Sequence, residues 1–107
     1  MGLVELDKLL KDIKKNLEDI YGGRLKKVIL FGSYARKEAT PLSDIDFLIV
    51  LDTFKSVGLE IERMNTFGSA LSLKYDITIS LIPVCEADYE NRKSPFLINV
   101  SKEGIAV

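Results

Sequence analysis

The segment Gly32–Val50, GSYARKEATPLSDIDFLIV, joins a turn-forming Gly-Ser pair to two aspartates at the start of an apolar run. Ten residues separate Ser33 from Asp44. Asp44 and Asp46 are two positions apart, so the alternation of a strand directs both carboxylates to one face. Neighbouring carboxylates resist joint ionisation unless a cation neutralises them. The pair therefore predicts a divalent cation site.

Magnesium is the cation that this pattern favours, because Mg²⁺ binds through one or two carboxylates plus substrate phosphates, whereas calcium prefers a fuller oxygen cage. We expect two ions, which together can clamp the attacking and leaving oxygens. A third carboxylate would complete such a site, and Asp76 is the candidate. It lies in Tyr75–Ile82, an alternating segment that predicts a strand with Asp76, Thr78 and Ser80 on its polar face.

The residues before the aspartates predict phosphate contacts. Lys27–Phe31 is a short, largely apolar strand candidate, and Gly32 and Ser33 follow it directly, before Tyr34–Ala39, which is expected to form a short helix. Glycine lets the backbone approach a ligand closely, and a helix N-terminus offers free N–H groups. Arg36 adds a cationic fork for a phosphate oxygen. Together these features predict a nucleotide-binding turn for a triphosphate.

Taken together, these features resemble the signature of the DNA polymerase β-type nucleotidyltransferase superfamily, and the short chain resembles a minimal nucleotidyltransferase. The matching residues are Gly32, Ser33, Ala35, Arg36, Ser43, Asp44 and Asp46. The resemblance implies an α/β (α+β) fold, a small mixed β-sheet with helices packed on one face and the active site on the other. One departure is Lys37, where the family often has glycine.

The resemblance also implies an activity and a partner. Members move a nucleoside monophosphate from a Mg²⁺-bound nucleoside triphosphate, and many are antitoxins encoded beside a HEPN-domain toxin. For this chain it implies transfer of AMP from ATP to a protein hydroxyl, with a HEPN ribonuclease toxin as the partner. Asp44, Asp46 and Asp76 would be catalytic and would hold the metal, while Gly32, Ser33 and Arg36 would bind the nucleotide. The donor base, acceptor and oligomeric state stay open.

Two other functions fit parts of this pattern. A non-catalytic module would neutralise its partner by occlusion and keep the nucleotide fold as a scaffold. The joint presence of Asp44, Asp46 and Asp76 favours catalysis over that alternative. Transfer to a small molecule, as in antibiotic-modifying relatives, usually requires a further substrate domain, for which this chain is short.

Composition indicates a single domain over residues 1–107, with 47% hydrophobic and 29% charged residues. The net charge of −1 gives no overall field that would recruit extended nucleic acid. The chain has no histidine, which excludes a Ser-His triad and histidine metal ligands. No apolar run approaches the ~18 residues of a membrane helix, and we expect a cytoplasmic protein without a membrane partner.

Three further helices are expected from apolar spacing and capping residues. The first is predicted by the stripe Leu3, Leu6, Leu10, Ile13, Leu17 and Ile20, and Gly22-Gly23 ends it. The second is predicted between residues 57 and 71, although Gly58 and Gly68 weaken it. The third begins after Ser94-Pro95 and ends at Gly104.

Overall fold

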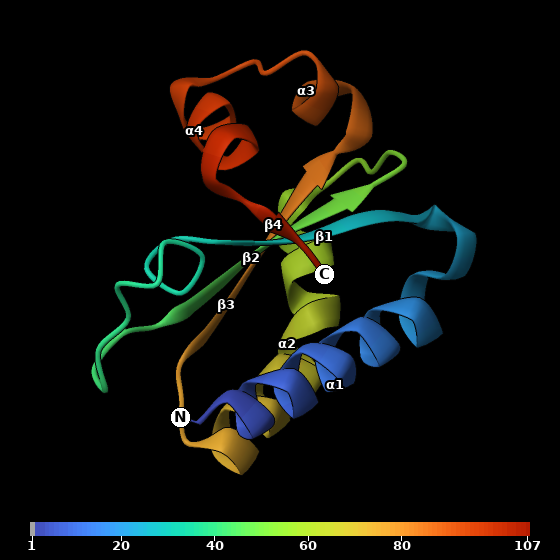
Figure 1. The fold of residues 1–107 in the computed structure, drawn as a ribbon. Helices are drawn as coiled ribbons and strands as arrows, with labels where there is room; N and C mark the ends of the chain where they lie inside the picture. Colours follow the sequence, from blue (N-terminus) through green and yellow to red (C-terminus); the bar gives the residue numbers. More distant parts are fainter. Residues whose placement is uncertain (1) are drawn as a thin grey trace.

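The two strands that flank the turn lie side by side in the middle of the sheet (Figure 1). The computed structural model describes residues 2–107. In it, β1 (Leu25–Phe31) and β2 (Ile45–Leu51) run antiparallel, and Phe31 pairs with Asp46. Both strands match the apolar runs that predict them.

The other two strands make the sheet mixed. β3 (Ile79–Cys85) pairs with β2 in parallel, and the short β4 (Ile105–Ala106) pairs antiparallel with β1, which gives the order β3-β2-β1-β4. The predicted fold class, a small mixed sheet with packed helices, is confirmed. β4 was not expected from the sequence, because two residues are too few for a periodic signal.

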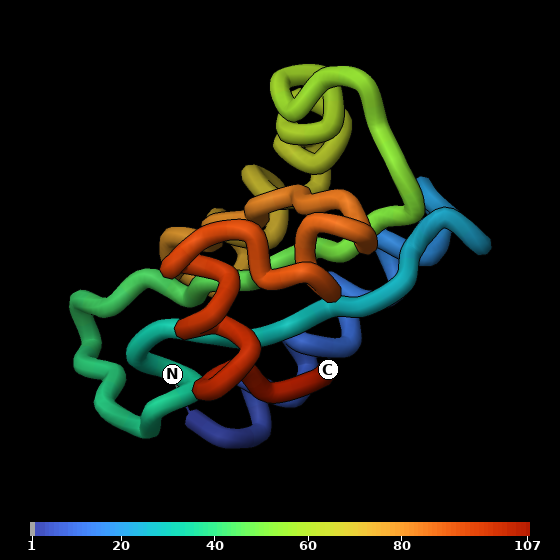
Figure 2. The backbone as a smooth tube through the Cα atoms, turned by 90° about the horizontal axis from the view of Figure 1, so that it is seen from above, coloured from blue at the N-terminus to red at the C-terminus, as the bar shows by residue number. Residues whose placement is uncertain are grey.

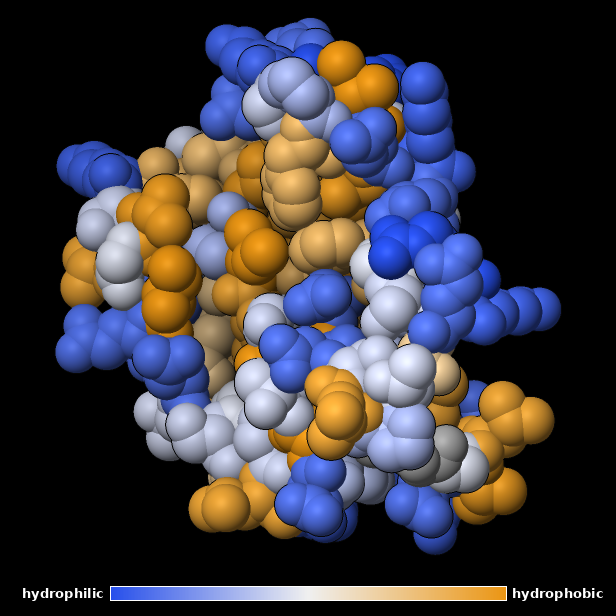
Figure 3. All heavy atoms as spheres, turned by 90° about the vertical axis from the view of Figure 1, so that its left-hand side faces the viewer, coloured by the Kyte–Doolittle hydropathy of each residue, from blue (hydrophilic) through white to orange (hydrophobic). Residues whose placement is uncertain are grey.

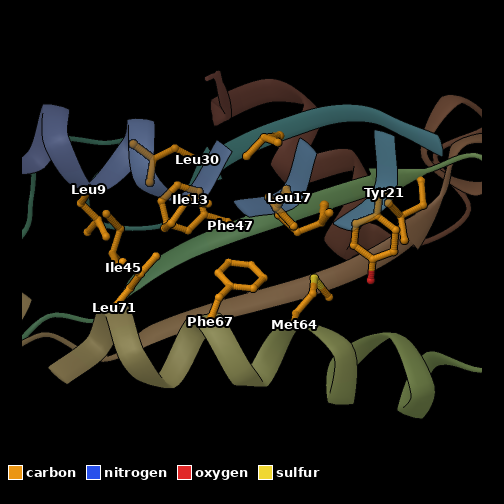
Figure 4. Close-up of a cluster of buried hydrophobic side chains, with 13 residues drawn as sticks. Leu9, Ile13, Leu17, Tyr21, Leu30, Ile45, Phe47, Met64, Phe67 and Leu71 are labelled. Atoms are coloured by element: carbon orange, nitrogen blue, oxygen red, sulfur yellow. The ribbon is translucent and has the colours of Figure 1, made fainter. Parts of the chain in front are cut away.

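Two long helices, α1 (Leu3–Tyr21) and α2 (Val57–Tyr75), cover one face of the sheet (Figure 1). The buried side chains of this layer are Leu9, Ile13, Leu17, Tyr21, Met64, Phe67 and Leu71 of the helices and Val28, Leu30, Ile45, Phe47, Ile49 and Leu51 of the strands (Figure 4). The buried face of α1 is rotated about the helix axis relative to the predicted apolar stripe. Leu9 and Tyr21 are buried, whereas Leu3 is 83% exposed. Gly68 lets α2 approach the sheet, since a Cβ there would lie 3.3 Å from Leu81 Cδ1.

The opposite face is covered in part by α3 (Glu86–Glu90) and α4 (Pro95–Glu103), which lie above the sheet in Figure 1. The second, smaller core joins Leu97 and Val100 of α4 to Ile29, Phe31, Leu48 and Val50 of the strands. Ser94 caps α4 as predicted, because its hydroxyl accepts a hydrogen bond from the Leu97 N–H at 3.2 Å. Helices therefore pack on both faces of the sheet, which corrects the expectation of helices on one face alone.

The predicted strand at Tyr75–Ile82 is wrong in its first part. Tyr75 ends α2, and β3 begins only at Ile79. Tyr75 follows Leu71 by one helical turn, and its hydroxyl donates a hydrogen bond to Asp12 of α1 at 2.6 Å. Helical spacing and this contact between helices outweigh the short period-2 pattern. Within residues 2–107, no helix is both long enough and apolar enough to span a membrane.

Tyr21 and Glu60 tie the two long helices together through a buried hydrogen bond. The Tyr21 hydroxyl donates to Glu60 Oε1 at 2.9 Å, and Glu60 is only 5% exposed. Burial and the bond to Glu60 raise the pKa of Tyr21 to about 12, so the hydroxyl remains a donor at neutral pH.

We expect Tyr21→Phe to lower the free energy of unfolding by about 1–3 kcal/mol, because it leaves the buried carboxylate without this donor. Urea unfolding followed by circular dichroism measures the change. Tyr89→Phe, on the partly exposed α3, is the control and should change stability by less than about 0.5 kcal/mol. Equal stability of Tyr21→Phe and the wild type would show that this bond contributes nothing.

Candidate functional site

Gly32 sits directly against the carboxylate of Asp46. It follows the last residue of β1 and has a φ of +76°. A Cβ at this position would lie 2.5 Å from Asp46 Oδ2. Glycine is required here both by the backbone conformation and by the close approach of the carboxylate. The pairing of Phe31 with Asp46 produces this contact, since it brings the end of β1 to the start of β2.

Residues 33–37 form a hydrogen-bonded turn, and the short helix predicted over Tyr34–Ala39 is absent there. The Arg36 N–H donates to Gly32 O at 3.1 Å, and the Glu38 N–H donates to Ser33 O at 2.8 Å. A weaker bond joins the Lys37 N–H to Tyr34 O at 3.4 Å. These bonds form a Schellman motif, which ends a helix after a single turn.

The backbone conformation of Lys37 ends the helical turn. Its φ is +60°, in the left-handed region, at the position of a Schellman motif that glycine usually occupies. The departure from the family pattern thus leaves the turn intact, but at an energetic cost, because a Cβ is unfavourable in this conformation.

We expect Lys37→Gly to raise the free energy of unfolding by about 1 kcal/mol. Glycine removes the energetic penalty of the left-handed conformation. Part of that gain is offset because glycine also increases the conformational entropy of the unfolded chain. Thermal or urea unfolding measures this gain. Lys37→Ala is the control, because it removes the charge and keeps the Cβ. If the alanine variant gains as much stability, charge rather than backbone strain is the cause.

Asp44 comes directly before β2, and Asp46 is the second residue of β2, on the face of the sheet that α4 partly covers. Asp46 alternates in phase with Leu48 and Val50, which contact α4, while Phe47 faces the long helices. The resemblance to the family placed the active site on this face. Asp46 is half-buried and Asp44 is exposed.

The electrostatics of Asp46 fit a cation site. Burial is the main cause that raises the pKa of Asp46, and the negative charge of Asp44 raises it further. The nearby Ser80 side chain and the positive charge of Arg36 lower the pKa of Asp46 in part. Ionised Asp46 is thus held at a cost that a bound divalent cation would remove. Ser80 pairs with Asp46 across the parallel strands, a register that the sequence did not reveal.

We expect Asp46→Asn to be more stable than the wild type at neutral pH in the presence of a chelator. The folded-state pKa of Asp46 lies above its unfolded value of 3.8, so ionisation destabilises the fold and wild-type stability rises as pH falls through the folded pKa. The advantage of the asparagine variant should shrink as the pH approaches 3.8.

Melting temperatures across this pH range measure the effect, with Asp52→Asn as the control of opposite sign. A hydrogen bond from the Thr53 N–H, followed by the Arg24 ion pair, lowers the pKa of Asp52, so its ionised form stabilises the fold. Asp52→Asn should therefore lose stability at neutral pH. A loss in the Asp46 variant as well would contradict the raised pKa of Asp46.

Asp76 lies at the end of α2 and not at the start of a strand, which corrects its predicted position. Its φ of +51° and ψ of +50° place it in the left-handed conformation that ends the helix, and its N–H donates to Ser72 O. Aspartate tolerates this conformation better than most residues do. Its side chain lines a hollow of about 350 Å³ together with Asp44.

The three predicted carboxylates do not come together as one group. Among residues 2–107, no three side chains of His, Cys, Asp or Glu are gathered as ligands for a metal ion. The charges of Asp44 and Asp46 interact with each other, whereas Asp76 and Asp44 only line the same hollow.

Leu42 and Leu73 line the same hollow and are 94% and 85% exposed. Figure 3 shows exposed apolar side chains among polar ones on the side of the molecule at left in Figure 1.

Arg36 is held by two carboxylates. Its Nε donates to Glu38 Oε2 at 3.1 Å, and its Nη1 donates to Glu103 Oε1 and Oε2 at 3.1 and 3.2 Å. These contacts raise the pKa of Arg36. Glu103 Oε1 also accepts a hydrogen bond from the Gly32 N–H at 3.4 Å. Two of the predicted phosphate donors thus contact one carboxylate of α4. The backbone of α4 lies beside the turn segment in Figure 2.

Sequence reasoning overlooked Glu103, although one signal was present. An acidic residue in the last turn of a helix opposes the helix dipole, so it requires another reason for its position. The contacts with Gly32 and Arg36 supply that reason.

Comparison with known proteins places this chain in a family. The nucleotidyltransferase domain family matches residues 7–105. The chain belongs to this family. The predicted enzyme class, a nucleotidyltransferase, is confirmed. A protein of Methanocaldococcus jannaschii named "Putative protein adenylyltransferase" is 35% identical over 97% of this chain and 100% of its own length. Protein adenylyltransferase MntA of Thermococcus cleftensis is 31% identical over 74% of this chain and 78% of its own.

Solved structures share the nucleotidyltransferase fold. A "putative nucleotidyltransferase" from Sulfolobus solfataricus has a TM-score of 0.66 at 23% identity, covering 99% of this chain and 87% of its own. A toxin-antitoxin with AMP-PNP has a TM-score of 0.63 at 21% identity, covering 90% and 69%. A complex of a tri-AMPylated Shewanella oneidensis HEPN toxin with an MNT antitoxin has a TM-score of 0.55 at 18% identity, covering 99% and 71%.

Proposed function

We propose that this nucleotidyltransferase is a Mg²⁺-dependent protein adenylyltransferase that moves AMP from ATP to a hydroxyl of a HEPN toxin and thereby acts as its antitoxin. One observation carries the proposal. The carboxylate of Asp46, with Asp44 beside it, lies against a turn whose Gly32 N–H and Arg36 already hold an anionic group. Carboxylates for a cation and donors for an anion thus occupy one corner of the sheet.

Each residue has a role in binding the nucleotide. Asp44 and Asp46 would hold Mg²⁺, and Gly32, Ser33 and Arg36 would contact the outer phosphates. Bound Mg²⁺ supplies charge neutralisation for the triphosphate and orients it for displacement. The chain contributes mainly positioning and preorganised charge, as is usual for phosphoryl transfer.

The transfer step forms one covalent bond and breaks one. The acceptor oxygen bonds to the α-phosphorus, and the bond from that phosphorus to the pyrophosphate oxygen breaks. The hydroxyl proton passes to Asp76, which lines the hollow next to Asp44. AMP remains on the acceptor and pyrophosphate leaves. This role for Asp76 requires the acceptor to reach into the hollow, whose rim is open and carries exposed Leu42 and Leu73.

The relatives support the choice of acceptor and partner. The two relatives above carry names of protein adenylyltransferases and match this chain over most of its length. Two of the structural neighbours are toxin-antitoxin complexes, one with AMP-PNP and one with a tri-AMPylated HEPN toxin.

A second candidate is a module that neutralises its partner by occlusion. The observation that favours it is the incomplete carboxylate group, since Asp76 stands apart from Asp44 and Asp46. Two carboxylates are nevertheless sufficient to bind Mg²⁺ when substrate phosphates supply the remaining ligands, which favours catalysis.

We expect Asp44→Asn and Asp46→Asn each to reduce transfer about a hundredfold or more, because each removes a charge that positions the triphosphate. The assay follows label from α-³²P-ATP, with Mg²⁺, to the protein encoded by the neighbouring reading frame, which the proposal expects to be a HEPN toxin. Asp76→Asn should also reduce transfer, because it removes the proposed acceptor of the hydroxyl proton. Asp52→Asn, just past the far end of β2, is the matched control and should retain activity.

Different outcomes separate the two candidates. Full labelling of the partner by the Asp44 and Asp46 variants would disprove the proposed site. A tight complex with the toxin that survives both substitutions, with no label under any condition, would identify the occluding module. Full transfer by Asp76→Asn would remove Asp76 from the proposed mechanism.

A further inference from the structure

Glu103 occupies the position where the proposed function requires a phosphate. Its carboxylate accepts hydrogen bonds from the Gly32 N–H and from Nη1 of Arg36, two donors assigned to the triphosphate. Carboxylate and phosphate oxygens make the same kind of charge-assisted hydrogen bonds to such donors. The pair of donors therefore forms an anion site in this structure, and the anion belongs to the chain itself.

The backbone of Glu103 is fixed on the sheet. Gly104 follows it, and a Cβ there would lie 2.5 Å from Ile29 Cγ2 and 2.6 Å from Val100 O. β4 then pairs with β1 through Ile105 opposite Leu30. The position of Glu103 beside the turn is consequently set by packing and strand pairing, and not by the ion pair alone.

The side chain of Glu103, in contrast, is partly exposed. Its exposed fraction is 30%, and that of the Arg36 side chain is 43%. Rotation about the side-chain bonds of Glu103 moves the carboxylate into solvent without displacing α4. Arg36 keeps its second partner, because Glu38 holds Nε from within the turn.

Charge makes it unfavourable for the Glu103 carboxylate and a triphosphate to occupy the turn together. Glu38, Asp44, Asp46 and Glu103 place four carboxylates around the turn, and Arg36 contacts two of them directly, Glu38 and Glu103. A triphosphate that entered beside Glu103 would meet a further negative charge and donors already engaged. Like charges at such distances repel strongly where solvent is partly excluded.

We infer that Glu103 is an autoinhibitory residue, an internal anion that closes the phosphate turn and must be displaced when a nucleoside triphosphate binds. This inference rests on the proposed function, because it assigns regulation to the same site. Glu103 would then set the affinity for the nucleotide and would not take part in the transfer step. A partner that contacts the end of α4 would have a direct means of controlling nucleotide entry.

The test compares Glu103→Gln with Glu38→Gln by calorimetric titration of Mg²⁺-AMP-PNP and of inorganic tripolyphosphate. Both variants remove one ion pair of Arg36, but only Glu103 also contacts the Gly32 N–H. We expect Glu103→Gln to bind both probes about tenfold more tightly, the change expected when one charge-assisted hydrogen bond no longer has to be broken. Glu38→Gln should stay within about twofold of the wild type.

Kinetics with the partner protein give a second readout. Glu103→Gln should lower KM for ATP and leave kcat unchanged, because the residue acts only before the nucleotide is bound. A fall in kcat, or unchanged or weaker binding of both probes, would overturn the inference and make Glu103 a positioning residue for Arg36. Glu103→Asp, which withdraws the carboxylate by one methylene, serves as a second variant if the glutamine variant fails to fold.

The outcomes distinguish this inference from the proposed function. Transfer by the wild type without tighter binding by Glu103→Gln would overturn the autoinhibitory role alone. Tighter binding by Glu103→Gln without label on any partner would support the autoinhibitory role and disprove adenylyl transfer. Failure of the wild type and both variants to bind either probe would overturn both.

Discussion

The antiparallel pairing of β1 with β2 is the constraint on which the site depends. It sets Phe31 opposite Asp46, and the next residue, Gly32, then turns with its Cα against the Asp46 carboxylate. Any side chain at position 32 would displace that carboxylate. The pairing therefore fixes, in one step, the distance between the turn that holds anions and the aspartates that fit a cation. Binding of a Mg²⁺-triphosphate requires both within a few ångström of each other.

The surrounding elements hold this pair in place and leave it partly open. α1 and α2 bury one face of β1 and β2, so the central strands are fully packed on that side. α4 covers only part of the other face, next to the aspartates. Asp46 is consequently half-buried, which raises its pKa and makes its ionised form costly. Such a cost is typical of functional sites, where stability is lost for the sake of binding.

The charges at this corner are arranged for exchange of one anion for another. Arg36 and the Gly32 N–H hold Glu103, and the same groups suit the phosphates of a nucleotide. The turn that carries Arg36 ends at Lys37 in a left-handed conformation, where the family often has glycine. The carboxylate of Glu103 is held through side-chain contacts on exposed groups, whereas its backbone is pinned by Gly104 and β4. In the inferred mechanism, motion of the Glu103 side chain frees these donors while α4 and β4 stay in place.

The sequence alone determined the central strands, the capped terminal helix and the pairing of Asp44 with Asp46 near Gly32, because these depend on local periodicity and on spacing along the chain. The family and the enzyme class followed from the same residues. Only the tertiary structure decided the positions of Asp76 and Glu103. Asp76 ends a helix because Tyr75 reaches Asp12 on another helix. Glu103 meets Gly32 because β4 pairs with β1. Both depend on contacts between residues far apart in the chain, which no local pattern encodes.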